Sequence, residues 1–90
     1  MSIRINIPSY LQPYTDENEA IEIDGYTIGE CLENLIAQFP DMKNMLFQKD
    51  GKLLDYVSIH TNGNFKHANE LSTPVNDGDE FHLLYILGGG

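Results

Sequence analysis

Cysteine, tryptophan and basic residues are scarce in this sequence of 90 residues. The single cysteine excludes an intramolecular disulfide and a metal site built from cysteines alone, and it fits a reducing cytoplasm. Five Lys and Arg against 14 Asp and Glu give a net charge of −9, which disfavours phosphate backbones and anionic lipid surfaces as partners. The longest apolar runs are also too short for a membrane helix. We therefore expect one cytoplasmic domain that binds neither nucleic acid nor membrane.

The chain begins with the pattern of a strand. Ile3, Ile5 and Ile7 alternate with polar residues from Ser2 to Ile7, which indicates a strand with one buried face. The polar stretch from Ser9 to Glu19 contains proline and predicts a surface connection. A second strand is expected from Ala20 to Ile23, followed by a turn at Asp24-Gly25.

The clearest element is a helix that starts after Thr27. Thr27 and Glu30 have the spacing of a capping box, in which two side chains satisfy free N–H groups of the first turn. Pro40 ends the helix, because the residue before a proline is disfavoured in the α region. The apolar positions recur at helical spacing and form one stripe that we expect to face a sheet: Ile28, Cys31, Leu32, Leu35, Ile36 and Phe39.

The second half of the chain contains shorter elements. A helical turn is expected from Asp41 to Phe47, with its apolar residues Met42, Met45 and Leu46 directed inward. A turn is expected at Asp50-Gly51, followed from Leu53 to Thr61 by one strand, or by two short ones broken by Asp55, with Val57 and Ile59 inward. The remaining predictions are a hairpin turn at Asn62-Gly63, a short edge strand from Phe65 to His67, a turn from Val75 to Glu80 and a last strand from Phe81 to Leu87. Because this last strand is apolar on both faces, it is expected to be central and covered twice, or to meet a partner with its second face.

This order of elements predicts an α+β domain with the β-grasp, or ubiquitin-like, arrangement. A mixed sheet of four to five strands carries one main helix packed across it, and the first and last strands are central neighbours. Residues 1–87 are predicted to form the single domain, and residues 88–90 a flexible tail of glycines.

The glycine tail is the first candidate for chemistry. Gly88, Gly89 and Gly90 have no side chains to pack, and an extended thread of three residues reaches about 10 Å beyond the domain. Such a thread can present the carboxylate of Gly90 to another protein's active site. A carboxylate is a poor electrophile, so reaction requires activation by that partner, most simply as an acyl-adenylate. A disordered end without a function is the alternative interpretation.

Several segments resemble the ThiS/MoaD family of ubiquitin-like sulfur carriers. The closing segment carries Asp77-Gly78-Asp79-Glu80-Phe81, a hydrophobic run and a terminal glycine pair. Ile3-Arg4-Ile5-Asn6-Ile7-Pro8 is similar to the family's first strand, Thr27-Ile28-Gly29-Glu30 to its helix start and Gly51-Lys52-Leu53-Leu54 to its middle turn. The stretches from Ile7 to Thr15 and from Lys52 to Ile59 look most like the CysO-like branch, which serves cysteine biosynthesis.

The resemblance implies roles for particular residues. Gly90 carries the acyl-adenylate and then the thiocarboxylate, Gly89 is its partner in the glycine pair, and Gly88 falls on a variable position. An E1-like enzyme of the ThiF or MoeB type activates the carrier with ATP, so the chain itself binds no cofactor. An apolar patch near the tail docks that enzyme, and Phe65 and Leu84 resemble positions on it. Filling the small core is the alternative role for these two residues.

The resemblance leaves the pathway open. Tyr85 and Ile86 stand where proline is common in two branches of the family, and the loop from Ser9 to Glu19 makes the chain longer than thiamin-type carriers. One interpretation is sulfur donation to a PLP-dependent cysteine synthase or a similar enzyme. The alternatives are the small subunit of molybdopterin synthase beside its large subunit, a ubiquitin-like modifier, and a non-covalent interaction domain. In the first interpretation the chain is a protein cosubstrate and not an enzyme.

The other chemistry-bearing residues predict no site. Cys31 lies within the apolar stripe of the helix, which favours a buried structural thiol. His60, His67 and His82 lack the spacings of common metal sites, so no metal is expected. No glycine-rich loop leads from a strand into a helix, which excludes a phosphate cradle of that type.

Overall fold

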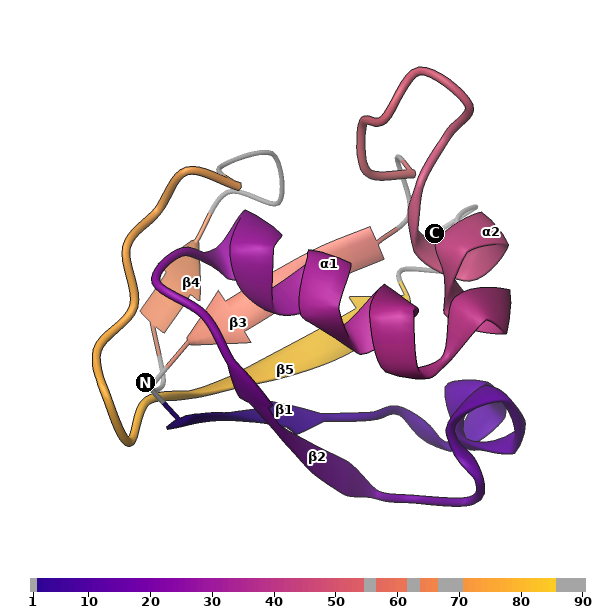
Figure 1. Cartoon of the computed structure of the whole chain (residues 1–90), viewed down its shortest axis with the longest axis horizontal. Coiled ribbons are helices and arrows are strands. Elements are labelled where there is room, and N and C mark those ends of the chain that lie inside the picture. The colour runs from indigo at the N-terminus through magenta and orange to yellow at the C-terminus, as the bar shows by residue number, and fades with distance from the viewer. Residues whose placement is uncertain (1, 55–56, 62–63, 67–70, 86–90) are drawn as a thin grey trace.

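The computed structural model describes residues 2–54, 57–61, 64–66 and 71–85. Within these residues the strands are β1 (Ser2–Asn6), β2 (Ala20–Asp24), β3 (Val57–Thr61), β4 (Asn64–Lys66) and β5 (Glu80–Tyr85), as Figure 1 shows. The helices are the 3-10 helix η1 (Ser9–Thr15), α1 (Ile28–Gln38), the 3-10 helix η2 (Pro40–Met42) and α2 (Lys43–Leu46). Apart from η1, this is the element order that the sequence predicts.

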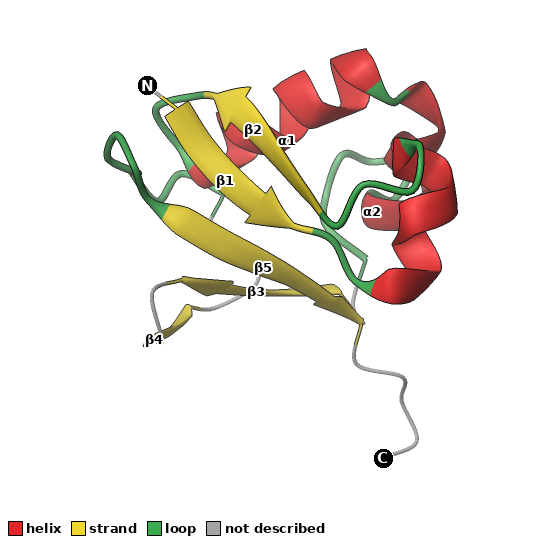
Figure 2. Cartoon of the chain, turned by 90° about the horizontal axis from the view of Figure 1, so that it is seen from below, coloured by secondary structure: helices red, strands yellow, loops and turns green. Residues whose placement is uncertain are grey.

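The strands form one mixed sheet in the order β2-β1-β5-β3-β4. β1 pairs in parallel with β5, with Asn6 opposite His82. The other neighbours pair antiparallel. The predicted central pairing of the first and last strands is therefore confirmed. Figure 2 shows the helices gathered on one side of this sheet, which is the β-grasp arrangement.

Helix α1 begins and ends where the sequence predicts. The Thr27 hydroxyl accepts a hydrogen bond from the backbone N–H of Glu30 at 3.1 Å. The Glu30 carboxylate accepts from the N–H of Tyr26 at 3.2 Å, one residue before the cap. Phe39 follows the helix, and Pro40 starts η2. Of the predicted stripe, the first four residues are fully buried, while Ile36 and Phe39 are partly buried against the same core.

The turn between β2 and α1 passes very close to the helix. A Cβ at Gly25 would lie 2.5 Å from the Sγ atom and 2.9 Å from the backbone nitrogen of Cys31. Neither contact is sterically allowed. The predicted turn at Asp24-Gly25 therefore needs glycine for space, because the helix starts immediately above it.

The segment after β1 corrects the expected surface connection from Ser9 to Glu19. Residues Ser9–Thr15 form η1, and both Leu11 and Thr15 are completely buried. The Thr15 Oγ1 lies 3.3 Å from the carbonyl oxygens of Gln12 and Asn18. The polar composition indicated a loop, but one leucine and one threonine are enough to anchor this short helix in the core.

The middle of the chain differs from the prediction at one strand boundary. The expected turn from Asp41 to Phe47 is confirmed as η2 and α2, with Met42 and Leu46 buried and Met45 partly buried. Of the two alternatives from Leu53 to Thr61, the single continuous strand is wrong: Leu53 forms an isolated bridge with Phe47, and β3 spans Val57–Thr61. The break expected at Asp55 lies outside the described residues. Gly51, with φ of +89°, occupies this turn as predicted.

The predicted hairpin and edge strand are confirmed in part. β3 and β4 are antiparallel with Thr61 opposite Asn64, and β4 is an edge strand. The residues Asp55, Asn62, Gly63, His67, Ile86 and Leu87, which the predictions also named, lie outside the described part of the chain. The last strand is central, and the helices of the described residues cover one of its two faces.

Candidate docking surface and tail

The end of β5 determines where the C-terminal segment leaves the domain. Tyr85 lies opposite Val57, the first residue of β3, and β5 runs parallel to β1. Figure 2 shows η1 at the end of the sheet to which the β5 arrow points. The three residues assigned to the reactive tail, Gly88, Gly89 and Gly90, lie outside the described residues, so their roles stay predictions.

Alternate residues of β5 face two different environments. Phe81 and Leu83 are 0% and 1% exposed in the core beneath the helices. His82 is exposed, and Leu84 is 39% exposed. Of the two alternatives for Leu84, the position on the open sheet face is confirmed and the position in the core is wrong. The side chain of Leu84 is therefore exposed to solvent, as its predicted docking role requires.

Ser58 is the direct neighbour of Leu84 on β3. The side chain of Ser58 is 1% exposed, and its Oγ atom has no hydrogen-bond partner among the described residues.

Phe65, the second predicted docking residue, lies opposite His60 in the pairing of β4 with β3. Its side chain is not among those described, so its docking role stays a prediction.

A polar cluster occupies the same face as Leu84, at the start of β5. Glu80 accepts a hydrogen bond from the Asn6 amide at 2.6 Å and forms an ion pair with Arg4 at 3.5 Å. Arg4 and Glu80 are adjacent because β1 and β5 pair at these residues. This face therefore combines a fixed polar cluster on β1 with an apolar position near the end of β5.

The other candidates from the sequence are the cysteine of α1 and the histidines. Cys31 is fully buried as predicted, and burial, with the Glu30 charge as a smaller cause, raises the pKa of its thiol to about 11. The thiol is therefore protonated at neutral pH. His60 and His82 lie opposite each other on β3 and β5, and His67 is outside the described residues. No group of three or more potential metal-ligating side chains occurs in the described ranges.

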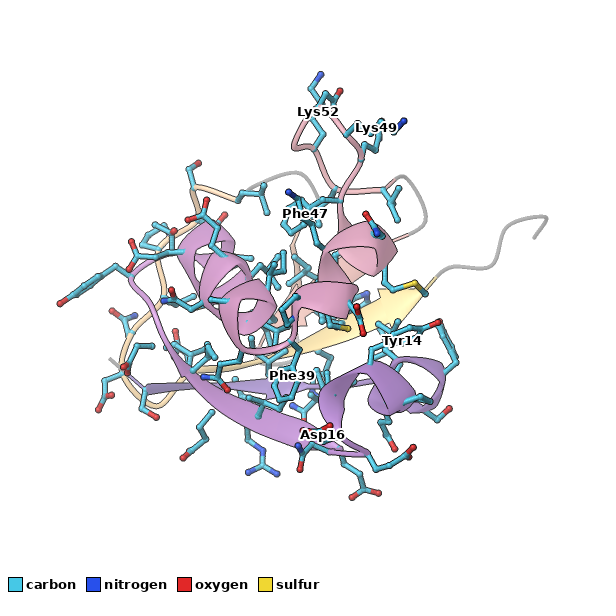
Figure 3. All side chains as sticks on the ribbon, turned by 45° about the vertical axis from the view of Figure 1, so that its right-hand side comes forward. Tyr14, Asp16, Phe39, Phe47, Lys49 and Lys52 are labelled. Carbon is cyan, nitrogen blue, oxygen red and sulfur yellow. The ribbon has the colours of Figure 1, made fainter. Side chains whose placement is uncertain are left out.

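A groove of about 710 Å³ lies between α1 and the loop that follows α2. Its partly buried apolar lining comes from Ile36, Phe47 and Leu71, with Glu33 and Lys43 also contributing. Figure 3 shows Lys49 and Lys52 at the tip of that loop. The groove is on the helix side of the sheet, whereas Leu84 is on the open side, so the two surfaces are separate.

The sequence interpretation missed the exposed aromatic residues of η1. Tyr10 is 43% exposed and Tyr14 is 38% exposed. The spacing of Tyr10, Leu11 and Tyr14 is compatible with a short helix that the leucine anchors in the core. The two nearby prolines and the polar run after Thr15 instead favour a loop when the sequence is considered alone.

The part of the chain that the structure describes contains no helix long and apolar enough to cross a membrane.

Comparison with known proteins identifies the family. The ThiS family profile matches residues 5–90. The chain is 28% identical to the sulfur carrier protein CysO of Mycobacterium tuberculosis over the whole of both chains. A crystal structure of that CysO superimposes with a TM-score of 0.82, covering 92% of this chain and 97% of the other.

Two further proteins resemble this chain, one in sequence and one in structure. The small archaeal modifier protein 1 of Haloferax volcanii is 31% identical over 78% of each chain. The BexX/CysO complex of Amycolatopsis orientalis contains a chain with a TM-score of 0.82 at 22% identity, covering 98% of this chain and 99% of that one. The archaeal modifier protein supports the family, and the BexX/CysO complex supports the fold. The chain thus belongs to the ThiS family, as a sulfur carrier protein of the ThiS, MoaD and CysO type.

Proposed function

We propose that the carboxylate of Gly90 is the reacting group of this carrier. An E1-like enzyme transfers AMP from ATP to the carboxylate, which forms an acyl-adenylate and releases pyrophosphate. Sulfide then attacks the acyl carbon and displaces AMP. Alternatively, a persulfide attacks and displaces AMP, and a thiol then reduces the resulting acyl disulfide. The product is a C-terminal thiocarboxylate whose sulfur is transferred to an acceptor.

The observation that carries this proposal is the position of β5. β5 is the central strand of the sheet, and Gly90, the last of three successive glycines, lies five residues beyond Tyr85 in the sequence. The alignment with CysO covers the whole of both chains. A central strand that leads, after two apolar residues, into a run of glycines suits a group that must enter another protein's active site.

The chemistry is divided between this chain and its partners. The only cysteine is buried and protonated, so it is not a suitable sulfur carrier. We therefore assign binding of ATP to the activating enzyme and transfer of sulfur to the acceptor enzyme. In this role the chain is a protein cosubstrate in the cytoplasm, and Leu84 and Phe65 contribute to docking, with Gly88 beside the reactive pair.

The proposed acceptor is a PLP-dependent synthase that makes cysteine or a related sulfur amino acid. The similarity to CysO over the full chain supports this pathway. The molybdopterin synthase small subunit is the second interpretation of the family resemblance. An adjacent gene for a PLP-dependent synthase, or for a large molybdopterin synthase subunit, distinguishes the two.

A modifier function is a further candidate, since one relative is named a small archaeal modifier protein. In that case the activated Gly90 forms an isopeptide with a lysine of another protein. Modifier and sulfur carrier share the adenylation step and differ only in the nucleophile that attacks the acyl group.

Intact mass spectrometry of the protein from its own host tests the proposal. Replacement of one oxygen by sulfur adds about 16 Da, because the thiocarboxylate differs from the carboxylate by one atom. A modifier instead produces conjugates of high mass. A Gly89→Val variant is expected to fold normally and to lose ATP–pyrophosphate exchange with the activating enzyme. Full exchange with this variant would exclude the proposed role of the tail.

A further inference from the structure

Two exposed tyrosines on η1 have no role in the function proposed above. Among the described residues, the large hydrophobic side chains that stay exposed are Tyr10, Tyr14, Tyr26 and Leu84. Two of the four are on one short helix. Tyrosine and other aromatic side chains are enriched in the centres of protein interfaces, where they bury a large area with few rotatable bonds.

These tyrosines lie at the end of the sheet from which the tail departs. Asn6 is opposite His82 in the parallel pair of β1 and β5. Ser9, the first residue of η1, is three residues beyond Asn6, just as Tyr85 is three residues beyond His82. The helix therefore begins level with the end of β5. Figure 3 shows Tyr14 at this same end of the molecule.

A buried leucine and several hydrogen bonds hold the backbone of η1 in place. Leu11 is fully buried, and its N–H donates to the carbonyl of Pro8 at 2.9 Å. The Gln12 amide donates to the carbonyl of Ile7 at 3.1 Å. After the helix, the N–H of Glu17 donates back to the carbonyl of Gln12 at 2.8 Å. Because the helix is ordered in advance, binding through it costs little conformational entropy.

The charges around η1 specify the chemistry of the partner. From residue 5 to residue 42 the sequence contains no Lys or Arg. Asp16, Glu17 and Glu19 follow η1 directly and are exposed, and Asp41 is exposed on η2, which contacts η1. A surface that combines aromatic rings with acidic side chains is complementary to an apolar patch bordered by lysines and arginines.

We propose that Tyr10 and Tyr14 form a second docking surface for the adenylating enzyme, beside the entrance through which that enzyme admits the tail. This inference rests on the proposed function, in which Gly90 is the reacting residue. The five residues from Ile86 to Gly90 can span at most about 18 Å when extended. The enzyme must therefore approach the end of β5 closely, and η1 is next to that end. Its contact with η1 uses apolar side chains flanked by basic ones.

Kinetics of ATP–pyrophosphate exchange test this surface with the full-length chain and the ThiF- or MoeB-type enzymes of its own host. A Tyr10→Ala/Tyr14→Ala variant is expected to raise the KM for the carrier by roughly tenfold with kcat unchanged, because the tail is intact. Phenylalanine at both positions keeps the rings and should keep the KM within about threefold. Tyr26→Ala is the matched control, because Tyr26 is 63% exposed beside the start of α1, near the other end of the sheet.

A single charge substitution tests the same surface even if the double-alanine variant fails to fold. Tyr14→Lys places a cation against the basic border of the entrance, so its KM should rise further, whereas Tyr26→Lys should leave KM unchanged. Thermal unfolding confirms that each variant is folded. Wild-type KM in a folded Tyr14→Lys or double-alanine variant overturns the second surface and leaves the proposed function intact. Absence of any exchange with the wild-type chain overturns both.

Discussion

Leu83 and Leu84 are chemically identical neighbours on β5 with different surroundings. Leu83 is 1% exposed beneath the helices, and Leu84 is 39% exposed on the open face of the same sheet. The alternation of a strand directs successive side chains to opposite faces. One strand therefore supplies the core on one side and an exposed apolar position on the other, so the proposed docking residue Leu84 is not one that the core depends on. Substitutions on the two faces should consequently affect different measurements.

The largest expected effect is on stability, at the buried position. Leu83→Ala removes a fully buried side chain and leaves a cavity, which should lower the free energy of unfolding by about 2–5 kcal/mol. Leu84→Ala, the matched control, should lower it by about 1 kcal/mol or less, because its side chain is already partly hydrated. Denaturant unfolding measures both. Equal losses for the two leucines would contradict the assignment of the faces.

A charge on the open face should affect binding and leave folding unchanged. Leu84→Glu keeps its carboxylate in water in the free carrier, so unfolding should change little. In the complex the same charge is buried without a partner, which should raise the KM for adenylation by about tenfold or more. Leu84→Met should retain activity, and Tyr26→Glu controls for the added charge. A folded Leu84→Glu variant with wild-type KM would remove Leu84 from the docking surface.

The sequence predicted the elements that depend on periodicity and caps. The alternation of Ile3, Ile5 and Ile7 and the stripe from Ile28 to Phe39 each require one apolar face to be buried, and both faces lie in the core. The cap at Thr27 and the stop before Pro40 involve only local backbone groups. Such local determinants can be recognised without knowing which elements pack together.

Features that depend on tertiary contacts were not accessible in this way. Nothing local indicates that Leu11 reaches the core, since its burial depends on how η1 packs beside β1. The exposure of Leu84 was left open because β5 is apolar on both faces, and only the sheet order and the single helix layer decide it. The glycine tail was recognised as a candidate site by its composition and by the family resemblance, neither of which defines its contacts.

The smallest expected effect concerns a pair of neighbouring contacts between β1 and β5. Ile5 lies opposite Phe81 in the core, whereas Arg4 lies opposite Glu80 on the open face. The side chains of Arg4 and Glu80 are 55% and 44% exposed, so water and salt screen their attraction. Glu80 also keeps its hydrogen bond from Asn6 when the arginine is removed. Arg4→Gln should therefore lower the free energy of unfolding by no more than about 0.5 kcal/mol, and less at high salt.

Chemical denaturation at low and high salt measures this difference, with Ile5→Ala as the control from the buried face. That control should cost about 2–5 kcal/mol and should not depend on salt, because it removes only apolar contacts. A loss above about 1.5 kcal/mol for Arg4→Gln would mean that the polar cluster also stabilises the fold. The open face would then be part of the scaffold, and its substitutions could not be interpreted as effects on docking alone.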